Sequence, residues 1–133
     1  MTTHQLVMLV WSLVGLSVFI YLFFQTAPYG RHQEKGWGSE ISSRWGWILM
    51  ESPAFYLMLI FLILNFSNSS NFSIFAAVLF MIHYFNRSFI WPIRARIKNK
   101  SMPVTIALSA FLFNFVNVYI QGTWLFYISD YTS

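Results

Sequence analysis

Two charged side chains interrupt otherwise apolar stretches of this 133-residue sequence, and they are the first candidates for chemistry. Glu51 lies in an apolar stretch at about 45–66, and Arg87 lies in another at about 72–91. An ionisable side chain inside a membrane span is costly and usually faces a cavity or a partner. Glu51 and Arg87 are therefore predicted to meet, either as part of a functional site or as an ion pair that only fixes helix register.

Tyr84 and His83 lie three and four residues before Arg87, so they share a broad face of the same predicted helix. Glu51 lies about six residues, roughly 9 Å, from one end of its span. Arg87 and Tyr84 lie about five and eight residues from the matching end of an antiparallel span. The carboxylate, the guanidinium and the phenol are therefore expected at similar depth. Pro53 should remove the hydrogen bond to the Leu49 carbonyl and kink the helix beside them.

A stripe of three amides runs along the apolar stretch at about 104–121. Asn114, Asn117 and Gln121 stand at i, i+3 and i+7, which places them on one side of a helix. Their side chains can hydrogen-bond a ligand, or they can hold neighbouring membrane helices together. Both interpretations stay open at this point.

The elements that must position these residues follow from the composition. The chain is 57% hydrophobic and 21% aromatic but only 9% charged, whereas soluble domains carry about 25% charged residues. Four continuous apolar stretches, at about 6–24, 45–66, 72–91 and 104–121, approach the ~20 residues that a membrane-spanning helix needs. The fold class is predicted to be an all-α integral membrane protein with four transmembrane helices, because the apolar runs do not alternate as barrel strands do.

Several functions are excluded or disfavoured by what the sequence contains. It has no cysteine, which excludes a disulfide framework and a thiolate nucleophile. Its three histidines are scattered without metal-ligand spacing, so no metal site is predicted. The net charge of +4 is too small and too local to indicate nucleic-acid binding.

The basic residues orient the predicted helices. Three of them follow the first span and four follow the third, while the loop at 65–71 has none; they are Arg31, Lys35 and Arg44, then Arg94, Arg96, Lys98 and Lys100. By the positive-inside rule, these two loops face the cytoplasm, and the N-terminus is lumenal or periplasmic. The second basic run is interpreted as a membrane-surface anchor or, alternatively, as a contact to an anionic cofactor.

Five local strings, in order, give a resemblance over the chain from about residue 20 onward. They are Ala-Pro-Tyr-Gly-Arg-His at 27–32, Gly-Trp-Gly at 36–38, Met-Glu-Ser-Pro-Ala-Phe at 50–55, His-Tyr-Phe-Asn-Arg-Ser-Phe-Ile at 83–90 and Asn-Val-Tyr-Ile-Gln-Gly at 117–122. Together they resemble the N-terminal half of the steroid 5α-reductase family, the 3-oxo-5α-steroid 4-dehydrogenases. Members of that family are seven-helix membrane oxidoreductases that use NADPH to reduce the C4–C5 double bond of a 3-oxo-Δ4 steroid.

The resemblance implies roles for particular residues. Glu51 and Tyr84 match the family's glutamate and tyrosine, which hydrogen-bond the C3 carbonyl of the substrate, and Tyr84 would be the donor, with its hydroxyl oriented by Glu51 or helped by Arg87. Arg87 matches an arginine near the nicotinamide and the substrate. The other polar residues of the predicted site are expected close to substrate or cofactor; they are His83, Asn114, Asn117 and Gln121. The implied surroundings are a lipid bilayer, of the endoplasmic reticulum in a eukaryote or the inner membrane in a bacterium, with a steroid or other lipid enone as substrate.

Two departures from the family pattern matter. Met50 stands where many members have Gln, so one polar contact to the substrate is expected to be missing. The chain also lacks the family's C-terminal half, with three spans and most of the NADPH-binding residues, so we expect it to be incomplete alone and to act with a separate C-terminal half chain. The alternatives are a fragment of an enoyl-CoA or polyprenol reductase, and a non-catalytic four-helix protein that partners other membrane chains.

Overall fold

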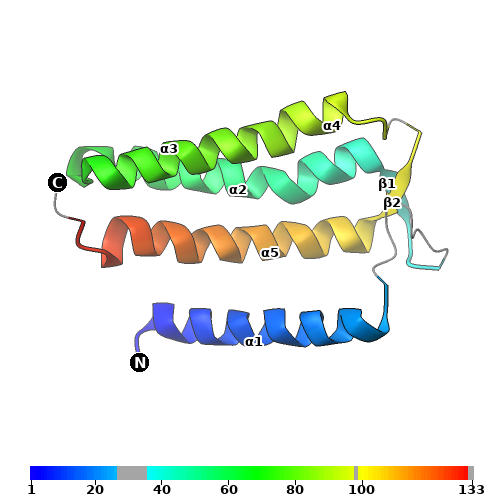
Figure 1. The fold of residues 1–133 in the computed structure, drawn as a ribbon, viewed down its shortest axis with the longest axis horizontal. Helices are drawn as coiled ribbons and strands as arrows, with labels where there is room; N and C mark the ends of the chain where they lie inside the picture. Colours follow the sequence, from blue (N-terminus) through cyan, green and yellow to red (C-terminus); the bar gives the residue numbers. More distant parts are fainter. Residues whose placement is uncertain (27–35, 98, 132–133) are drawn as a thin grey trace.

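The computed structural model describes residues 1–26, 36–97 and 99–131, in which four long helices run alternately up and down (Figure 1). Helix α1 covers Thr3–Phe24, α2 covers Ser43–Asn65, and α3 covers Asn71–Phe85. A π-helical turn over Asn86–Ile90 and the short α4, Trp91–Arg94, continue α3. Helix α5 covers Val104–Thr123 and is continued by a second π-helical turn over Trp124–Ile128.

All four helical stretches are long and apolar enough to cross a membrane. Their mean hydropathies lie between 1.3 and 2.4; the stretches are Thr3–Phe24, Ser43–Asn68, Asn71–Arg94 and Val104–Ile128. Most of their large apolar side chains are exposed on the folded chain, as expected for surfaces that face lipid. The prediction of an all-α integral membrane protein with four membrane-spanning helices is therefore confirmed.

Helix α2 is the centre of the arrangement. It packs against α5 on one side and α3 on the other, while α1 lies beyond α5 and packs chiefly against it (Figure 1). Small and flexible side chains fill the central contact; they are Ala54, Met58, Leu62, Ala77 and Val118. A polar residue on the buried side of α2 can therefore meet partners from two different helices.

A short antiparallel sheet joins the two loops that carry the basic residues. Strand β1, Glu40–Ser42, pairs with β2, Ser101–Pro103, so that Ile41 stands opposite Met102. The all-helical expectation did not include this sheet, because three-residue strands are too short to show an alternating pattern. The pairing joins the first and third loops at one end of the helices; among the predicted basic loop residues, Arg31, Lys35 and Lys98 lie outside the described residues.

Helix α2 continues through Pro53, and side chains bond the carbonyls around it. Proline has no N–H to donate to the Leu49 carbonyl. Instead, the Ser52 hydroxyl donates to that carbonyl at 3.4 Å. The Asn114 amide of α5 donates to the next carbonyl, that of Met50, at 2.7 Å. Asn114 therefore connects α5 to the backbone of α2 at the residue that precedes Glu51.

Candidate functional site

Glu51 is the buried centre of the candidate site. Only 4% of the residue is exposed, and both carboxylate oxygens have partners from other helices. Oε1 lies 2.8 Å from Nε of Arg87, on the π-helical turn after α3. Oε2 accepts a hydrogen bond from Nδ2 of Asn114 on α5 at 3.4 Å. The predicted contact between Glu51 and Arg87 is thus present, and the Asn114 amide of α5 is a second partner of the carboxylate.

Arg87 stands between the buried carboxylate and the molecular surface. Its side chain is 45% exposed, and its ion pair with Glu51 is made through Nε. The guanidinium carbon lies 5.3 Å from the centre of the Trp47 ring. The π-helical turn places one additional residue in the turn that carries Arg87, and such turns occur often at functional sites. The terminal amino groups of Arg87 are therefore accessible to a further ligand.

Tyr84 contributes a phenol on the same side of α3. It is half-buried against the central contact of α2, α3 and α5, and its ring lies 4.5 Å from the Phe80 ring. No hydrogen bond joins its hydroxyl to Glu51, whose carboxylate oxygens bind Arg87 and Asn114. Among the described residues the Tyr84 hydroxyl has no hydrogen-bond partner. Its O–H is therefore available to donate to an added molecule.

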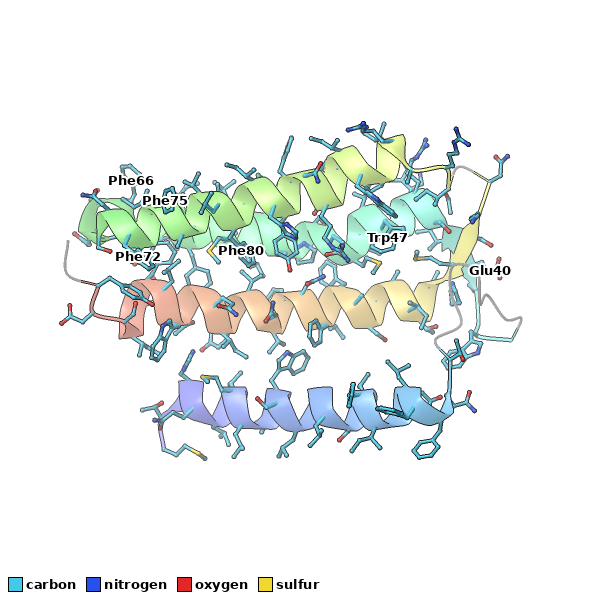
Figure 2. All side chains as sticks on the ribbon, viewed as in Figure 1. Glu40, Trp47, Phe66, Phe72, Phe75 and Phe80 are labelled. Carbon is cyan, nitrogen blue, oxygen red and sulfur yellow. The ribbon has the colours of Figure 1, made fainter. Side chains whose placement is uncertain are left out.

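The other predicted residues lie at different distances from this centre. Asn114 is in it, and Asn117 is half-buried one turn further along α5. Gln121 is exposed and lines a cavity of about 260 Å³ together with Met58 and Phe80. In Figure 2, Phe80 lies on the side of α3 that faces α5. His83 is exposed, and its ring meets the edge of Tyr84 at 5.1 Å. The stripe of amides thus divides into one site residue, Asn114, and two that lie further along the helix.

Two contributors escaped the sequence-based prediction. Trp47, one helical turn before Glu51, lies under the Arg87 guanidinium. Trp47 stands four residues before Glu51, a spacing that places both on one side of a helix. Aromatic residues are so frequent in this chain that the spacing alone does not distinguish Trp47 from the others. Ser52 was the other, as the donor to the Leu49 carbonyl. Within the described ranges, no three His, Asp or Glu side chains come together in a way that could hold a metal ion.

Comparison with known proteins identifies relatives of this chain. No family model matches it. A steroid 5-alpha-reductase DET2 of Gossypium hirsutum is 40% identical over 124 residues, which cover 89% of this chain and 47% of the relative. The protein of the same name from Arabidopsis thaliana is 35% identical over 121 residues, or 87% of this chain and 46% of the relative.

A more distant match comes from an animal. The 3-oxo-5-alpha-steroid 4-dehydrogenase 1 of Bos taurus is 27% identical over 116 residues, covering 84% of this chain and 45% of the relative. The predicted resemblance is confirmed, since plant and animal proteins carrying these names match most of the chain. Over most of its residues the chain is a homologue of the steroid 5-alpha-reductases, and it spans about half the length of the curated relatives it matches.

Proposed function

We propose that this chain carries the substrate-activating part of an NADPH-dependent membrane reductase that saturates the C4–C5 double bond of a 3-oxo-Δ4 steroid. The names of the relatives support the reaction class and the substrate class. The observation that carries the assignment of residues is the arrangement around Glu51. A buried carboxylate is held by a cation and an amide, and a phenol with an uncommitted hydroxyl packs against the central contact three residues before the cation.

The chemistry of an enone explains why such a site is useful. Reduction adds a hydride at C5 and a proton at C4, and during hydride addition negative charge moves onto the C3 oxygen. A donor already directed at that oxygen lowers the barrier. Tyr84 is proposed as this donor. Arg87 offsets the negative charge of Glu51, which would otherwise oppose the charge that develops on the substrate.

The donor groups at this end of the chain suit part of NADPH. Arg87 keeps accessible amino groups that can hydrogen-bond a carboxamide or phosphate oxygen, and Arg94 and Arg96 are exposed nearby in sequence. When bound, NADPH would supply the hydride. The chain matches about half of each relative. We propose that most of the cofactor-binding groups belong to a region equivalent to the unmatched half of the relatives, on the same or a separate polypeptide.

The proposed placement in the membrane follows from the basic loops. The end that carries β1 and β2 faces the cytoplasm, and the N-terminus faces the lumen of the endoplasmic reticulum or the bacterial periplasm. A steroid or related lipid enone would then reach Tyr84 from within the bilayer, and the cofactor would approach from the cytoplasmic end.

Two membrane preparations test this function. One contains the chain itself. The other contains a hybrid, in which this chain replaces the matched part of the cotton relative. Both are incubated with NADPH and a 3-oxo-Δ4 steroid, an enoyl-CoA or a polyprenol substrate, and products are measured by mass spectrometry. The intact cotton relative is the positive control, and Glu51→Gln in the hybrid is the negative control. We expect the hybrid to produce the 5α-reduced steroid and Glu51→Gln to lower that production strongly.

Two results would contradict the proposal. One is absence of steroid turnover by both the chain and the hybrid in membranes where the cotton relative is active. The other is turnover of an enoyl-CoA or polyprenol substrate in preference to the steroid, which would move the chain to a different reductase class.

A further inference from the structure

Trp47 is a residue of α2 that is connected to the site through Arg87. It precedes Glu51 by one helical turn, and its ring faces the Arg87 guanidinium, whose carbon lies 5.3 Å from the ring centre. That distance is within the ~6 Å over which a cation is attracted by an aromatic face. Figure 2 shows Trp47 on the part of α2 that lies close to the β1–β2 end.

The Trp47 ring is itself held by the neighbouring helix. The Trp91 ring of α4 packs against it at 4.6 Å, with 61° between the ring planes. The last turn of α4 is fixed by Arg44 of α2, whose Nε donates to the Pro92 carbonyl at 3.1 Å. Nη2 of Arg44 also lies 3.5 Å from the Ile93 carbonyl. The ring contact between Trp47 and Trp91 and the hydrogen bond from Arg44 therefore both join α2 to α4 beside the Trp47 indole.

Arg87 needs such support because its side chain is half-exposed although it pairs with a buried carboxylate. Nε lies 2.8 Å from Oε1 of the carboxylate, and the Arg87 side chain is 45% exposed. A half-exposed arginine has several rotatable bonds, and loss of that freedom opposes a fixed geometry. Guanidinium is weakly hydrated and stacks well on aromatic rings, so the indole face restricts its orientation at low cost.

We propose that Trp47 is a positioning residue that keeps the Arg87 guanidinium directed at Glu51 through a cation–π contact. Its effect on turnover rests on the proposed function, because it acts only through Arg87. The contact itself is a property of this chain and can be measured without any reaction.

The first test observes the Arg87 side chain directly. The chain is placed in lipid nanodiscs, and the arginine Nε–H resonances are recorded by NMR, with Arg87→Lys identifying the resonance of Arg87. We expect a protected Nε–H resonance displaced by the ring current of Trp47. Trp47→Leu should remove the displacement and accelerate exchange of the proton with water. Trp45→Leu is the matched control, since Trp45 lies two residues away and is 63% exposed.

An Arg87 Nε–H resonance that is unchanged in position and exchange rate by Trp47→Leu would overturn the proposal. The same holds if Trp45→Leu changes it as much as Trp47→Leu does, because the effect would then come from the helix and not from this ring.

The second test asks whether the contact matters for turnover in the hybrid. Mono-, di- and trifluorotryptophan are incorporated at position 47, since successive fluorines weaken the aromatic face with little change in size. We expect turnover to fall stepwise with fluorine number, and by roughly two- to thirty-fold in Trp47→Leu, with thermal stability unchanged in the fluorinated series.

A purely structural role predicts the opposite pattern, with full turnover throughout the fluorinated series and loss of stability in Trp47→Leu. That result would overturn the positioning role. If neither the chain nor the hybrid shows turnover where the cotton relative is active, the proposed function fails, while the NMR comparison still decides whether Trp47 holds Arg87.

Discussion

Asn114 shows how one side chain can join two helices and complete a site. Its Nδ2 donates to the Met50 carbonyl at 2.7 Å and lies 3.4 Å from Oε2 of Glu51. The residue is 8% exposed, so water from outside the chain does not readily replace these bonds. The amide therefore connects the backbone of α2 and the buried carboxylate to α5.

Replacing Asn114 with Leu should destabilise the chain by about 1–3 kcal/mol, because the Met50 carbonyl and Glu51 each lose a donor while remaining buried. Thermal unfolding of the detergent-solubilised chain is the measurement. Asn117→Leu is the matched control, since Asn117 is half-buried on the same helix, one turn away. Equal stability losses in the two variants would contradict the role assigned to Asn114.

At the residue scale, the sequence indicated which charged residues belong to the site better than it indicated which residues hydrogen-bond them. Glu51 and Arg87 were identified because a charge in an apolar run must have a reason to be there. Spacing placed Tyr84 near Arg87, but its role as a donor came only from the family resemblance. The bond from Asn114 to Met50 could not be predicted, because it depends on how far α5 is shifted along α2, and no local pattern encodes that shift.

At the element scale, the contact between α2 and α5 depends on a glycine. A Cβ atom added at Gly122 would lie 2.4 Å from Cδ2 of Phe61, and Gly122 is itself buried. Phe61 is also stacked against Phe126 and meets the edge of Tyr127, which limits its freedom to move away. The two helices therefore approach closely here because residue 122 has no side chain.

Gly122→Ala should consequently destabilise the chain by about 1–3 kcal/mol, in the range found for overpacked cores. Gly15→Ala is the control on α1, where nothing lies within 4 Å of the added Cβ. That substitution should be neutral or stabilise by up to about 1 kcal/mol through helix propensity. Urea or thermal unfolding of both variants is the measurement, and a Gly122→Ala chain as stable as Gly15→Ala would show that the close approach is not needed.

The helices were predictable and the sheet was not, for one physical reason. An apolar run long enough to cross a membrane carries its signal in many residues, so each helical stretch contains the span expected from the sequence. The pairing of β1 with β2 involves three residues on each side, and their partners are about sixty positions apart. Their pairing follows from the helices, which bring the two loops to the same end.

At the scale of the whole molecule, the helices form an open arrangement and not a closed bundle. Helix α2 makes most of the contacts with both α3 and α5, and α1 adds to the outer side of α5 (Figure 1). The chain also spans about half the length of its relatives. The seven-helix arrangement is a prediction from the family resemblance, and the orientation in the membrane is a prediction from the loop charges.

The orientation can be tested with single cysteines, since the sequence contains no native cysteine. A cysteine at position 96, in the loop after α4, should be shielded from an impermeant thiol reagent added to the lumenal or periplasmic side. A cysteine at position 69, in the turn between α2 and α3, should be labelled there. The positive-inside rule is the reason for both expectations. Labelling at 96 but not at 69 would reverse the proposed orientation.

The central claim is that Tyr84 donates to the oxygen that gains charge during reduction, and one substitution tests it most directly. Tyr84→Phe keeps the ring that packs against Phe80 and removes only the hydroxyl. The matched control is Tyr56→Phe, because Tyr56 is 52% exposed on α2. Turnover of a 3-oxo-Δ4 steroid and thermal stability are measured on the same membrane preparations of the hybrid. We predict that Tyr84→Phe lowers turnover by ~10²–10³-fold with stability unchanged, as for loss of one oxyanion donor, while Tyr56→Phe retains full turnover. Near-normal turnover by Tyr84→Phe, or a loss shared equally by Tyr56→Phe, would contradict the account.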